Sequence, residues 1–450
     1  MYSKHPALFT DLYELKMLEA YLREGMTGEA IFTVFIRRVP PQRNFLLACG
    51  LDTVLEYLEN VRFDEADIEY LSSLGHFSKE LLDSLRHFRF EGEVRAVPEG
   101  TPVFANEPIL EIRAPIAQAQ LVETYVTNQI HLQTLLASKA SRVVLAAQGR
   151  PVVDFGARRM HGIDAALKAA RAFYIAGVVS TSNVLAGQLY GLPVAGTMAH
   201  SYVQAHDLEM DAFRAFARTY PDTTLLVDTY DTLDGVRRVI QLARELGEAF
   251  QIQAVRLDSG DLVELARESR KLLDAAGLQR VKIFASGGLD EYEVAKLVRE
   301  APVDAFGVGT SMGVSADKPD LDIVYKLAEY EGRGRLKLAT DKPVLPGAKQ
   351  VFRFEENGVA VRDVIARADE QLGGRPLLEC VMRGGKRLDS ARRTLDQMRD
   401  YAREQIAKLP AALHALETAA QPYQVEISDA LAEHQRELQR ELAQRQNVQL

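Results

Sequence analysis

The chain has 450 residues, and its 54 Lys and Arg against 63 Asp and Glu give a net charge of −9. Hydrophobic residues make up 47% and charged residues 26%, which is ordinary for a soluble globular protein and excludes wholesale disorder. No stretch approaches the ~18 uninterrupted apolar residues of a transmembrane helix, and the acidic balance argues against non-specific nucleic-acid binding. We therefore expect neither a membrane nor a nucleic acid as partner.

The cysteines and the first residues indicate the compartment. The two cysteines, Cys49 and Cys380, lie far apart in apolar surroundings, which argues against a disulfide framework and against a Cys-based zinc site. The first sixteen residues, MYSKHPALFTDLYELK, contain no apolar region of a secretory signal peptide. The expected location is the reducing cytoplasm.

The first third of the chain mixes strand-like and helix-like segments. Residues 30–37 and 93–113 resemble strands broken by turns, with the Pro- and Gly-rich run PEGTPVFANEPI in the second. Residues 53–88 resemble helices. This part does not share the pattern of the middle of the chain.

From about residue 150 to 312 a short apolar run is followed by small, polar or glycine residues and then by a helix-like stretch. The apolar runs are Val152–Phe155, Gly177–Val179, Pro193–Ala195, Thr224–Val227, Ile252–Val255, Lys282–Phe284 and Ala305–Val308. The helix-like stretches include Ile163–Tyr174, Leu233–Leu246, Leu262–Ala275 and Glu291–Glu300. Near-continuous apolar strands indicate burial on both faces and hence parallel pairing. Seven such units favour an irregular parallel α/β barrel, with an open doubly wound sheet as the alternative.

After the repeats, KLAEYEGRGRLKLATDK predicts a hairpin with Gly332 and Gly334 at its turn, followed by PGAKQVFR. We predict a second α/β domain built from both chain ends around the barrel. The expected divisions are 1–125 and 326–424 for the mixed domain, 126–325 for the barrel, and 425–450 for a charged helical tail that is solvated or contacts another subunit.

The strand ends of an α/β barrel share one face, and here they carry an unusual density of charge. Those ends would bring together His200, Arg158, Arg159, Arg256, Asp228, Asp231, Asp258 and Asp261.

Two adjacent strand ends resemble a phosphate cradle. One is Ser286-Gly287-Gly288 and the other runs from Gly307 to Ser311, and glycines let the backbone N–H groups approach an anion. The alternative interpretation is plain tight turns. The glycine spacing is GxGxxxG rather than GxGxxG, and no GxxxxGK[ST] sequence exists, so Rossmann and P-loop sites are excluded.

The acidic residues come in two pairs with the same spacing. Asp231 and Asp261 are good helix N-cap candidates. Asp228 and Asp258 lie earlier, at the strand ends, where a carboxylate can hold Mg²⁺ or ribose hydroxyls.

His200 follows a Gly-Thr-x-Ala turn at another strand end. It is either a hydrogen-bonded structural residue or a nucleophile that accepts a phosphoryl group, and His161 and His206 are alternatives with weaker placement. The sequence lacks HExxH, GxSxG and CxxC motifs. The residues alone therefore indicate an α/β barrel enzyme acting on a phosphorylated, ribose-like anion.

Several motifs together resemble the nicotinate phosphoribosyltransferases, which are type II phosphoribosyltransferases. In chain order, over about residues 5 to 355, the motifs are FTDLYELKM, FIRRVPPQRNFLLACG, DFGARRMHG, STSNVLAG, GTMAHS, VDTYD, VRLDSGD, FASGG, FGVGTS and LPGAKQVFR. The resemblance implies transfer of phosphoribose from 5-phosphoribosyl 1-pyrophosphate to nicotinate, an entry step of NAD salvage. It also implies coupling to ATP hydrolysis through a phosphohistidine, a Mg²⁺ requirement, and a homodimer with shared active sites.

By the same resemblance, each motif supplies site residues. His200 is the phosphohistidine, Phe155 stacks on the pyridine ring, and Arg256 pairs with the nicotinate carboxylate or ring face. The base pocket also takes Thr181, Ser182, Thr197, and Tyr13 from the partner subunit. Arg158 contacts phosphate and pyrophosphate, and Asp258 binds the ribose hydroxyls. The 5′-phosphate cradle comprises Gly287, Gly288, Gly309 and Thr310, and Mg²⁺ would lie near Asp228 and Asp258.

Three alternatives remain at this point. Nicotinamide phosphoribosyltransferase has the same fold and mechanism, but in those enzymes the position of Ser182 carries an aspartate that accepts a hydrogen bond from the carboxamide. Quinolinate phosphoribosyltransferase is a shorter relative with more basic residues around its substrate. The third alternative is a non-catalytic binding protein with the same fold.

Overall fold

The computed structural model describes residues 6–338 and 344–446, and the chain divides into two units. The barrel unit comprises residues 136–319, and the flanking unit comprises residues 1–135 and 320–450. The sequence predicted a barrel over 126–325 between two segments of a mixed domain. No described helix combines the length and the apolar composition needed to cross a bilayer.

The barrel unit contains a parallel six-stranded sheet in the order β7-β6-β11-β10-β9-β8. The strands are β6 (Val152–Asp154), β7 (Ser180–Thr181), β8 (Thr224–Leu226), β9 (Ala254–Leu257), β10 (Lys282–Ala285) and β11 (Ala305–Val308). The first strand, β6, pairs with the last, β11, as in a closed barrel. The fold prediction of an irregular parallel barrel is therefore confirmed.

The barrel is incomplete at one place. The predicted strand 193–195 makes a single bridge, from Val194 to Thr181 of β7, and within the described residues no pairing joins it to β8. The sheet is thus a curled half-barrel whose opening lies between residues 193–195 and β8. The segment that carries His200 comes directly after this short strand.

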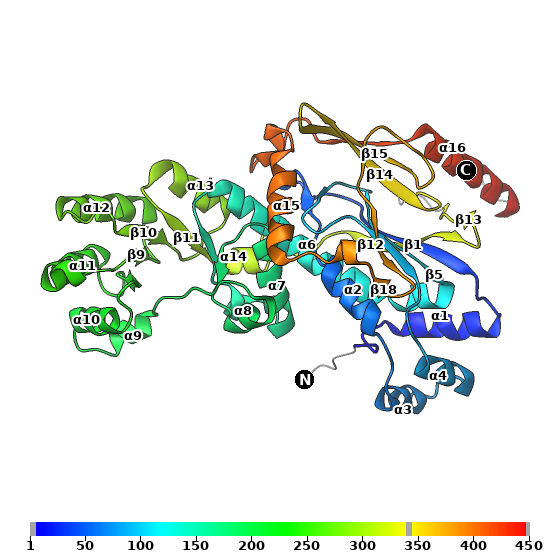
Figure 1. Ribbon diagram of the computed structural model, residues 1–450, viewed down its shortest axis with the longest axis horizontal. Helices are drawn as coiled ribbons and strands as arrows, with labels where there is room; N and C mark the ends of the chain where they lie inside the picture. Colours follow the sequence, from blue (N-terminus) through cyan, green and yellow to red (C-terminus); the bar gives the residue numbers. More distant parts are fainter. Residues whose placement is uncertain (1–5, 339–343, 447–450) are drawn as a thin grey trace. The chain divides into compact units, whose positions relative to one another are not determined.

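Helices connect the strands, and α10 to α13 lie along the outer side of β9 to β11 (Figure 1). The helices are the second half of α6 (Glu123–Ala146), α7 (Ile163–Ile175), α8 (Val184–Tyr190), α9 (His200–Gln204), α10 (Glu209–Thr219), α11 (Thr232–Leu246), α12 (Leu262–Ala275), α13 (Glu291–Glu300) and α14 (Thr310–Gly313), with a 3₁₀ turn η1 (Ala157–Arg159). Asp231 and Asp261 cap α11 and α12 by accepting backbone N–H groups of the first turn. Both capping predictions are confirmed.

The flanking unit is formed by both ends of the chain. Its largest sheet has the order β13-β12-β1-β5-β3-β17-β18, in which β1 (Glu29–Ile36) lies between β5 (Pro108–Pro115) and β12 (Ile323–Tyr330). Its other strands are β2 (Leu46–Leu47), β3 (Glu93–Ala96), β4 (Pro102–Val103), β13 (Arg333–Gly334), β14 (Lys349–Glu356), β15 (Val359–Arg367), β16 (Arg375–Pro376), β17 (Glu379–Arg383), β18 (Lys386–Arg387) and β19 (Gln424–Ile427). Its helices are α1 (Leu12–Arg23), α2 (Leu51–Asn60), α3 (Glu65–Ser73), α4 (Lys79–Arg86), α5 (Ile116–Leu121), the first half of α6, α15 (Leu395–Ala407) and α16 (Asp429–Gln446).

Two predictions about the C-terminal part need correction in detail. The hairpin after residue 323 turns at Glu331 and Gly332, both with positive φ, and its second strand is only two residues long. The remainder of the predicted hairpin includes residues 339–343, which lie outside the described residues. Of the predicted helical tail 425–450, residues 425–427 belong to strand β19, Asp429–Gln446 form α16, and 447–450 lie outside the described residues. Helix α16 packs on β15 and buries Leu431 completely, so it is an integral part of the flanking unit.

Candidate functional site

Arg256, near the end of β9, is the centre of a hydrogen-bonded cluster. One guanidinium nitrogen, Nη1, donates to Thr197 Oγ1 at 2.7 Å and to the Met198 carbonyl at 3.3 Å. Nε donates to Ser286 Oγ at 3.1 Å, and Nη2 lies 3.2 Å from Asp258 Oδ1. The planar donor set is therefore fixed in three directions at once, which a lysine could not achieve.

The Arg256 guanidinium also lies over an aromatic ring. Its Cζ is 5.6 Å from the ring centroid of Phe155, at the end of β6, and Phe155 in turn lies 5.8 Å from the Phe284 ring. Gly307 provides the space, because a Cβ there would come within 2.7 Å of Phe155. A cation beside an aromatic face suits a flat, anionic, aromatic ligand.

Asp258 links the arginine to His200. Its Oδ1 accepts a hydrogen bond from the Ser286 hydroxyl as well as from Arg256, and its Oδ2 lies 4.0 Å from His200 Nε2. The other imidazole nitrogen, Nδ1, lies 3.2 Å from Thr229 Oγ1. Since the His200 side chain is 39% exposed, a ligand in solvent can reach it.

Asp228 lies beside Asp258 because β8 and β9 pair in register. Its Oδ2 accepts from the Asp258 backbone N–H at 3.0 Å and from the Ser259 hydroxyl at 2.6 Å. Its Oδ1 is buried and has no hydrogen-bond partner within residues 6–338 and 344–446. A buried carboxylate oxygen without a donor fits a site for a cation.

A second buried carboxylate, Asp154, organises the start of the next loop. It accepts hydrogen bonds from the Gly156 N–H at 2.8 Å and the Thr181 hydroxyl at 2.7 Å. Burial raises the pKa of Asp154, and these two hydrogen bonds oppose the increase. Ser182 comes after Thr181 and is exposed, whereas Asn183 caps α8 through Ala186 N–H, so helix capping does not explain Ser182.

The two predicted phosphate turns come after the neighbouring strands β10 and β11. Gly287 has φ +89°, and a Cβ at this position would lie 1.8 Å from the Asp258 carbonyl oxygen, so only glycine fits. Gly288 has φ +66° and faces open space. Gly309 precedes Thr310, the first residue of α14. This geometry is compatible with an anion held between the two turns.

Comparison with known proteins identifies the family. Three models match in succession: the nicotinate phosphoribosyltransferase N-terminal domain over residues 8–131, the nicotinate phosphoribosyltransferase family over 151–360, and the nicotinate phosphoribosyltransferase C-terminal domain over 372–435. The chain is also 55% identical over 426 residues to nicotinate phosphoribosyltransferase pncB2 of Mycobacterium tuberculosis, covering 94% of this chain and 92% of that protein. The chain belongs to the nicotinate phosphoribosyltransferase family.

More distant relatives and solved structures are also similar to this chain. Nicotinate phosphoribosyltransferase of Bacillus subtilis is 40% identical, over 81% of this chain and 77% of its own length. The crystal structure of human nicotinic acid phosphoribosyltransferase superimposes with a TM-score of 0.86 at 30% identity, covering 95% of this chain and 99% of that chain. The crystal structure of nicotinate-nucleotide pyrophosphorylase from Pyrococcus furiosus superimposes with a TM-score of 0.73 at 26% identity. It covers 89% of this chain and 95% of that chain.

Some predicted site residues stand apart from the cluster. Arg158 is exposed on the 3₁₀ turn after β6 and has no partner among the described residues. Within those residues no side-chain hydrogen bond joins Thr310 to the Arg256 cluster. Tyr13 belongs to the flanking unit, where its ring is 47% exposed and where burial and the neighbouring Glu123 raise its pKa. Their proposed roles need a ligand or a second subunit.

Sequence reasoning missed Thr229 and Asp154, and it assigned Ser286 only to a phosphate turn, not to the hydrogen bonds with Arg256 and Asp258. Each lies inside a recognised motif, in VDTYD, DFGARR and FASGG respectively. The available signal was a hydroxyl or carboxylate at the end of a barrel strand or within three residues after it, because those positions face the site.

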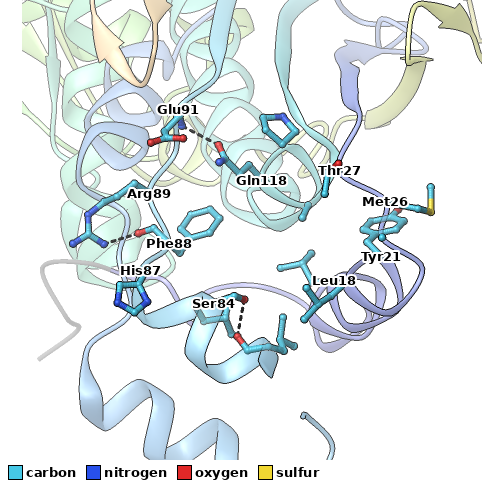
Figure 2. A pocket seen from close by; sticks show the side chains of 16 residues that line it. Leu18, Tyr21, Met26, Thr27, Ser84, His87, Phe88, Arg89, Glu91 and Gln118 are labelled. Atoms are coloured by element: carbon cyan, nitrogen blue, oxygen red, sulfur yellow. Dashed lines mark hydrogen bonds between the residues drawn. The ribbon is translucent and has the colours of Figure 1, made fainter. Parts of the chain in front are cut away.

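The flanking unit contains a separate pocket of about 340 Å³, between α1, α4 and the start of α5 (Figure 2). Its walls are mainly apolar, with Leu18 and Phe88 among them, and the Glu91 N–H donates to Gln118 Oε1 at its rim. None of the predicted site residues lines this pocket. It therefore plays no part in the site described above.

Proposed function

We propose that this chain transfers the 5-phosphoribosyl group of 5-phosphoribosyl 1-pyrophosphate to the ring nitrogen of nicotinate. The products are nicotinate mononucleotide and pyrophosphate, so the reaction is the first step of NAD biosynthesis from nicotinate. Membership of the family supports this function. The observation that carries it is the Arg256 guanidinium beside the Phe155 ring, held by Thr197, Ser286 and Asp258.

In this proposal the base pocket recognises a flat anion. The pyridine ring stacks on Phe155, and Arg256 faces the carboxylate or the ring. Thr197 orients Arg256, while Thr181 and Ser182 lie where the loop after β7 begins. Stacking and a fixed cation orient the ring nitrogen toward the anomeric carbon, and such positioning lowers the barrier to displacement.

The phosphoribosyl donor is proposed to lie along the strand ends next to this pocket. Gly287, Gly288, Gly309 and Thr310 form the cradle of the 5′-phosphate, Asp258 binds the ribose hydroxyls, and Arg158 neutralises the departing pyrophosphate. Displacement at the anomeric carbon passes through an oxocarbenium-like state, as in glycoside chemistry. A fixed cation and N–H donors stabilise the leaving group as its charge develops.

A magnesium ion fits the acidic side of the site. Asp228 Oδ1, buried and without a donor among the described residues, and the adjacent Asp258 carboxylate would hold it. The ion would supply positive charge to the pyrophosphate oxygens. Hard oxygen ligands of this kind suit Mg²⁺.

Coupling to ATP is proposed to use His200. Its Nδ1 contacts Thr229, which leaves Nε2 to attack the γ-phosphorus of ATP. The N–P bond forms as the P–O bond to ADP breaks, and water later returns the imidazole by hydrolysis. Asp258, whose Oδ2 lies 4.0 Å from Nε2, would be adjacent to the phosphoryl group.

The functional assembly is proposed to be a homodimer in which Tyr13 of one subunit completes the site of the other. The chain exposes apolar side chains that a partner subunit would cover. Phe9, Leu12 and Tyr13 are 45–47% exposed at the start of α1, and Val184 and Leu189 are 74% and 56% exposed on α8. The cytoplasmic location expected from the sequence stays a prediction, which cell fractionation would test.

The test is release of pyrophosphate from 5-phosphoribosyl 1-pyrophosphate with nicotinate, nicotinamide and quinolinate in turn, with and without ATP. We expect release with nicotinate, and stimulation by ATP. Release with nicotinamide alone would favour the nicotinamide enzyme, and release with none of the three would favour a binding protein.

A further inference from the structure

A buried lysine outside the strand-end site is ion-paired to the segments that follow the two proposed phosphate turns. Lys139 is on α6, and its side chain is only 2% exposed. Its Nζ lies 2.5 Å from Glu291 Oε2 and 2.8 Å from Asp317 Oδ1. Neither carboxylate belongs to the cluster around Arg256, so the site chemistry does not explain this cation.

The two carboxylates come shortly after the two turns in the sequence. Glu291, which is fully buried, is the first residue of α13 and comes three positions after Gly288. Asp317 comes seven positions after Thr310, and consecutive hydrogen-bonded turns connect them, including Val314 N–H to the Thr310 carbonyl and Ala316 N–H to the Ser311 carbonyl. One ammonium group therefore anchors the chain segment on the C-terminal side of each turn.

A second cation secures the first of these attachments. Arg142, one turn further along α6, donates from Nε to Glu291 Oε1 at 2.9 Å and from Nη2 to the Tyr292 hydroxyl at 3.1 Å. Burial acts to raise the pKa of Glu291, but Lys139 and Arg142 outweigh it and keep the pKa below its usual value. The carboxylate thus stays ionised and bound on both oxygens.

Burying the charges of Lys139, Glu291 and Asp317 costs free energy. Stability alone therefore does not explain why they are buried. A buried ion pair is often no more stabilising than apolar residues of the same volume, and its clearest benefit is a defined geometry. Here the geometry defined is the separation of the two turns that are proposed to hold one phosphate.

We propose that Lys139 is a positioning residue that holds the Gly287–Gly288 and Gly309–Thr310 turns at the spacing needed for the 5′-phosphate of the phosphoribosyl donor. The inference rests on the proposed phosphate cradle. Because the phosphate is bound equally in the ground state and the transition state, loosening its cradle raises KM for that substrate and leaves kcat nearly unchanged.

The experiment compares four variants of the full-length chain by steady-state kinetics and thermal unfolding. Lys139→Met removes the shared cation, and Asp317→Asn releases only the second turn. Thr310→Val tests the cradle itself. Arg353→Met is the matched control, because it removes an equally buried cation, 2.6 Å from Asp363, in the flanking unit.

We expect Lys139→Met and Asp317→Asn to raise KM for 5-phosphoribosyl 1-pyrophosphate on the order of tenfold, with kcat and KM for nicotinate changed less than about threefold. Arg353→Met should lower Tm without changing any KM. Asp317→Asn keeps the test informative if Lys139→Met fails to fold.

Two results would overturn the inference. One leaves the proposed phosphate cradle standing, and the other overturns the cradle as well. If Thr310→Val raises this KM while Lys139→Met and Asp317→Asn behave like the control, the cradle stands and Lys139 has no positioning role. If Thr310→Val leaves this KM unchanged, the cradle proposal fails and the inference fails with it.

Discussion

Replacing Arg256 by lysine tests the base pocket most directly, because it keeps the charge and removes the planar donor set. The guanidinium makes three side-chain hydrogen bonds, to Thr197 at 2.7 Å, Ser286 at 3.1 Å and Asp258 at 3.2 Å. Its Cζ also lies 5.6 Å from the Phe155 centroid. A lysine ammonium is a single point that cannot reach all four positions together.

The expected loss can be worked out from these contacts. A hydrogen bond involving a charged group contributes about 1.5–3 kcal/mol, and the variant keeps at most one or two of the three. Loss of roughly 3 kcal/mol of transition-state binding, at about 1.4 kcal/mol per factor of ten, corresponds to a fall of about 100-fold in kcat/KM for nicotinate.

Arg270→Lys is the matched control in the same unit. Arg270 also makes three guanidinium contacts, to Asp274 and to the carbonyls of Leu278 and Val281. Val281 precedes β10, so these contacts lie at the strand end opposite the site. We expect this variant to lose stability but to keep kcat/KM within about twofold. If Arg256→Lys loses less than fivefold in kcat/KM, or no more than the control, Arg256 does not bind the pyridine.

Four further predictions test the other proposals. His200→Ala should abolish ATP cleavage and the acid-labile phosphoenzyme while slow ATP-independent synthesis survives; labelling to the wild-type extent would refute the assignment. Mixing inactive Tyr13→Ala and Arg256→Ala chains should restore part of the activity if sites are shared, and absence of rescue in hybrids shown to form would contradict the shared site. Ser182→Asp should shift kcat/KM from nicotinate toward nicotinamide by 10²-fold or more, on the order expected for a like charge in a dry pocket, and an unchanged ratio would exclude a role in selectivity. Burial raises the pKa of Glu14 to about 7, so the folded chain binds a proton that the unfolded chain releases near 4.5, and stability falls as pH rises through this interval. The Tm of Glu14→Gln relative to wild type should therefore increase from pH 5 to pH 8, and a constant difference would contradict this ionisation.

Features governed by local chemistry could be predicted from the sequence. Asp231 and Asp261 were assigned to helix N-caps, and both accept first-turn N–H groups. The central helices and strands were found within a few residues of their observed ends, because apolar strand runs and amphipathic helices are short-range patterns. These elements depend on neighbours in the sequence, not on partners across the fold.

Features governed by pairing across the fold could not be predicted. Ser286 lies between Arg256 and Asp258 only because β9 and β10 pair with Ala285 opposite Leu257. The Lys139–Glu291 ion pair joins residues 152 positions apart. The sequence shows that these polar and charged residues are present, but the register of the strands decides which of them come into contact.

The two Asp pairs show how these levels combine at the site. In each pair the second carboxylate is used by the next helix, which leaves the first, Asp228 or Asp258, at the strand end. Pairing of β8 with β9 then brings these two strand ends together, and the Asp258 N–H donates to Asp228. Local spacing thus selects which carboxylates remain available, and sheet register turns two separate acids into one acidic surface beside His200 and Arg256. That acidic surface is where we propose that the cation opposite the pyrophosphate is held.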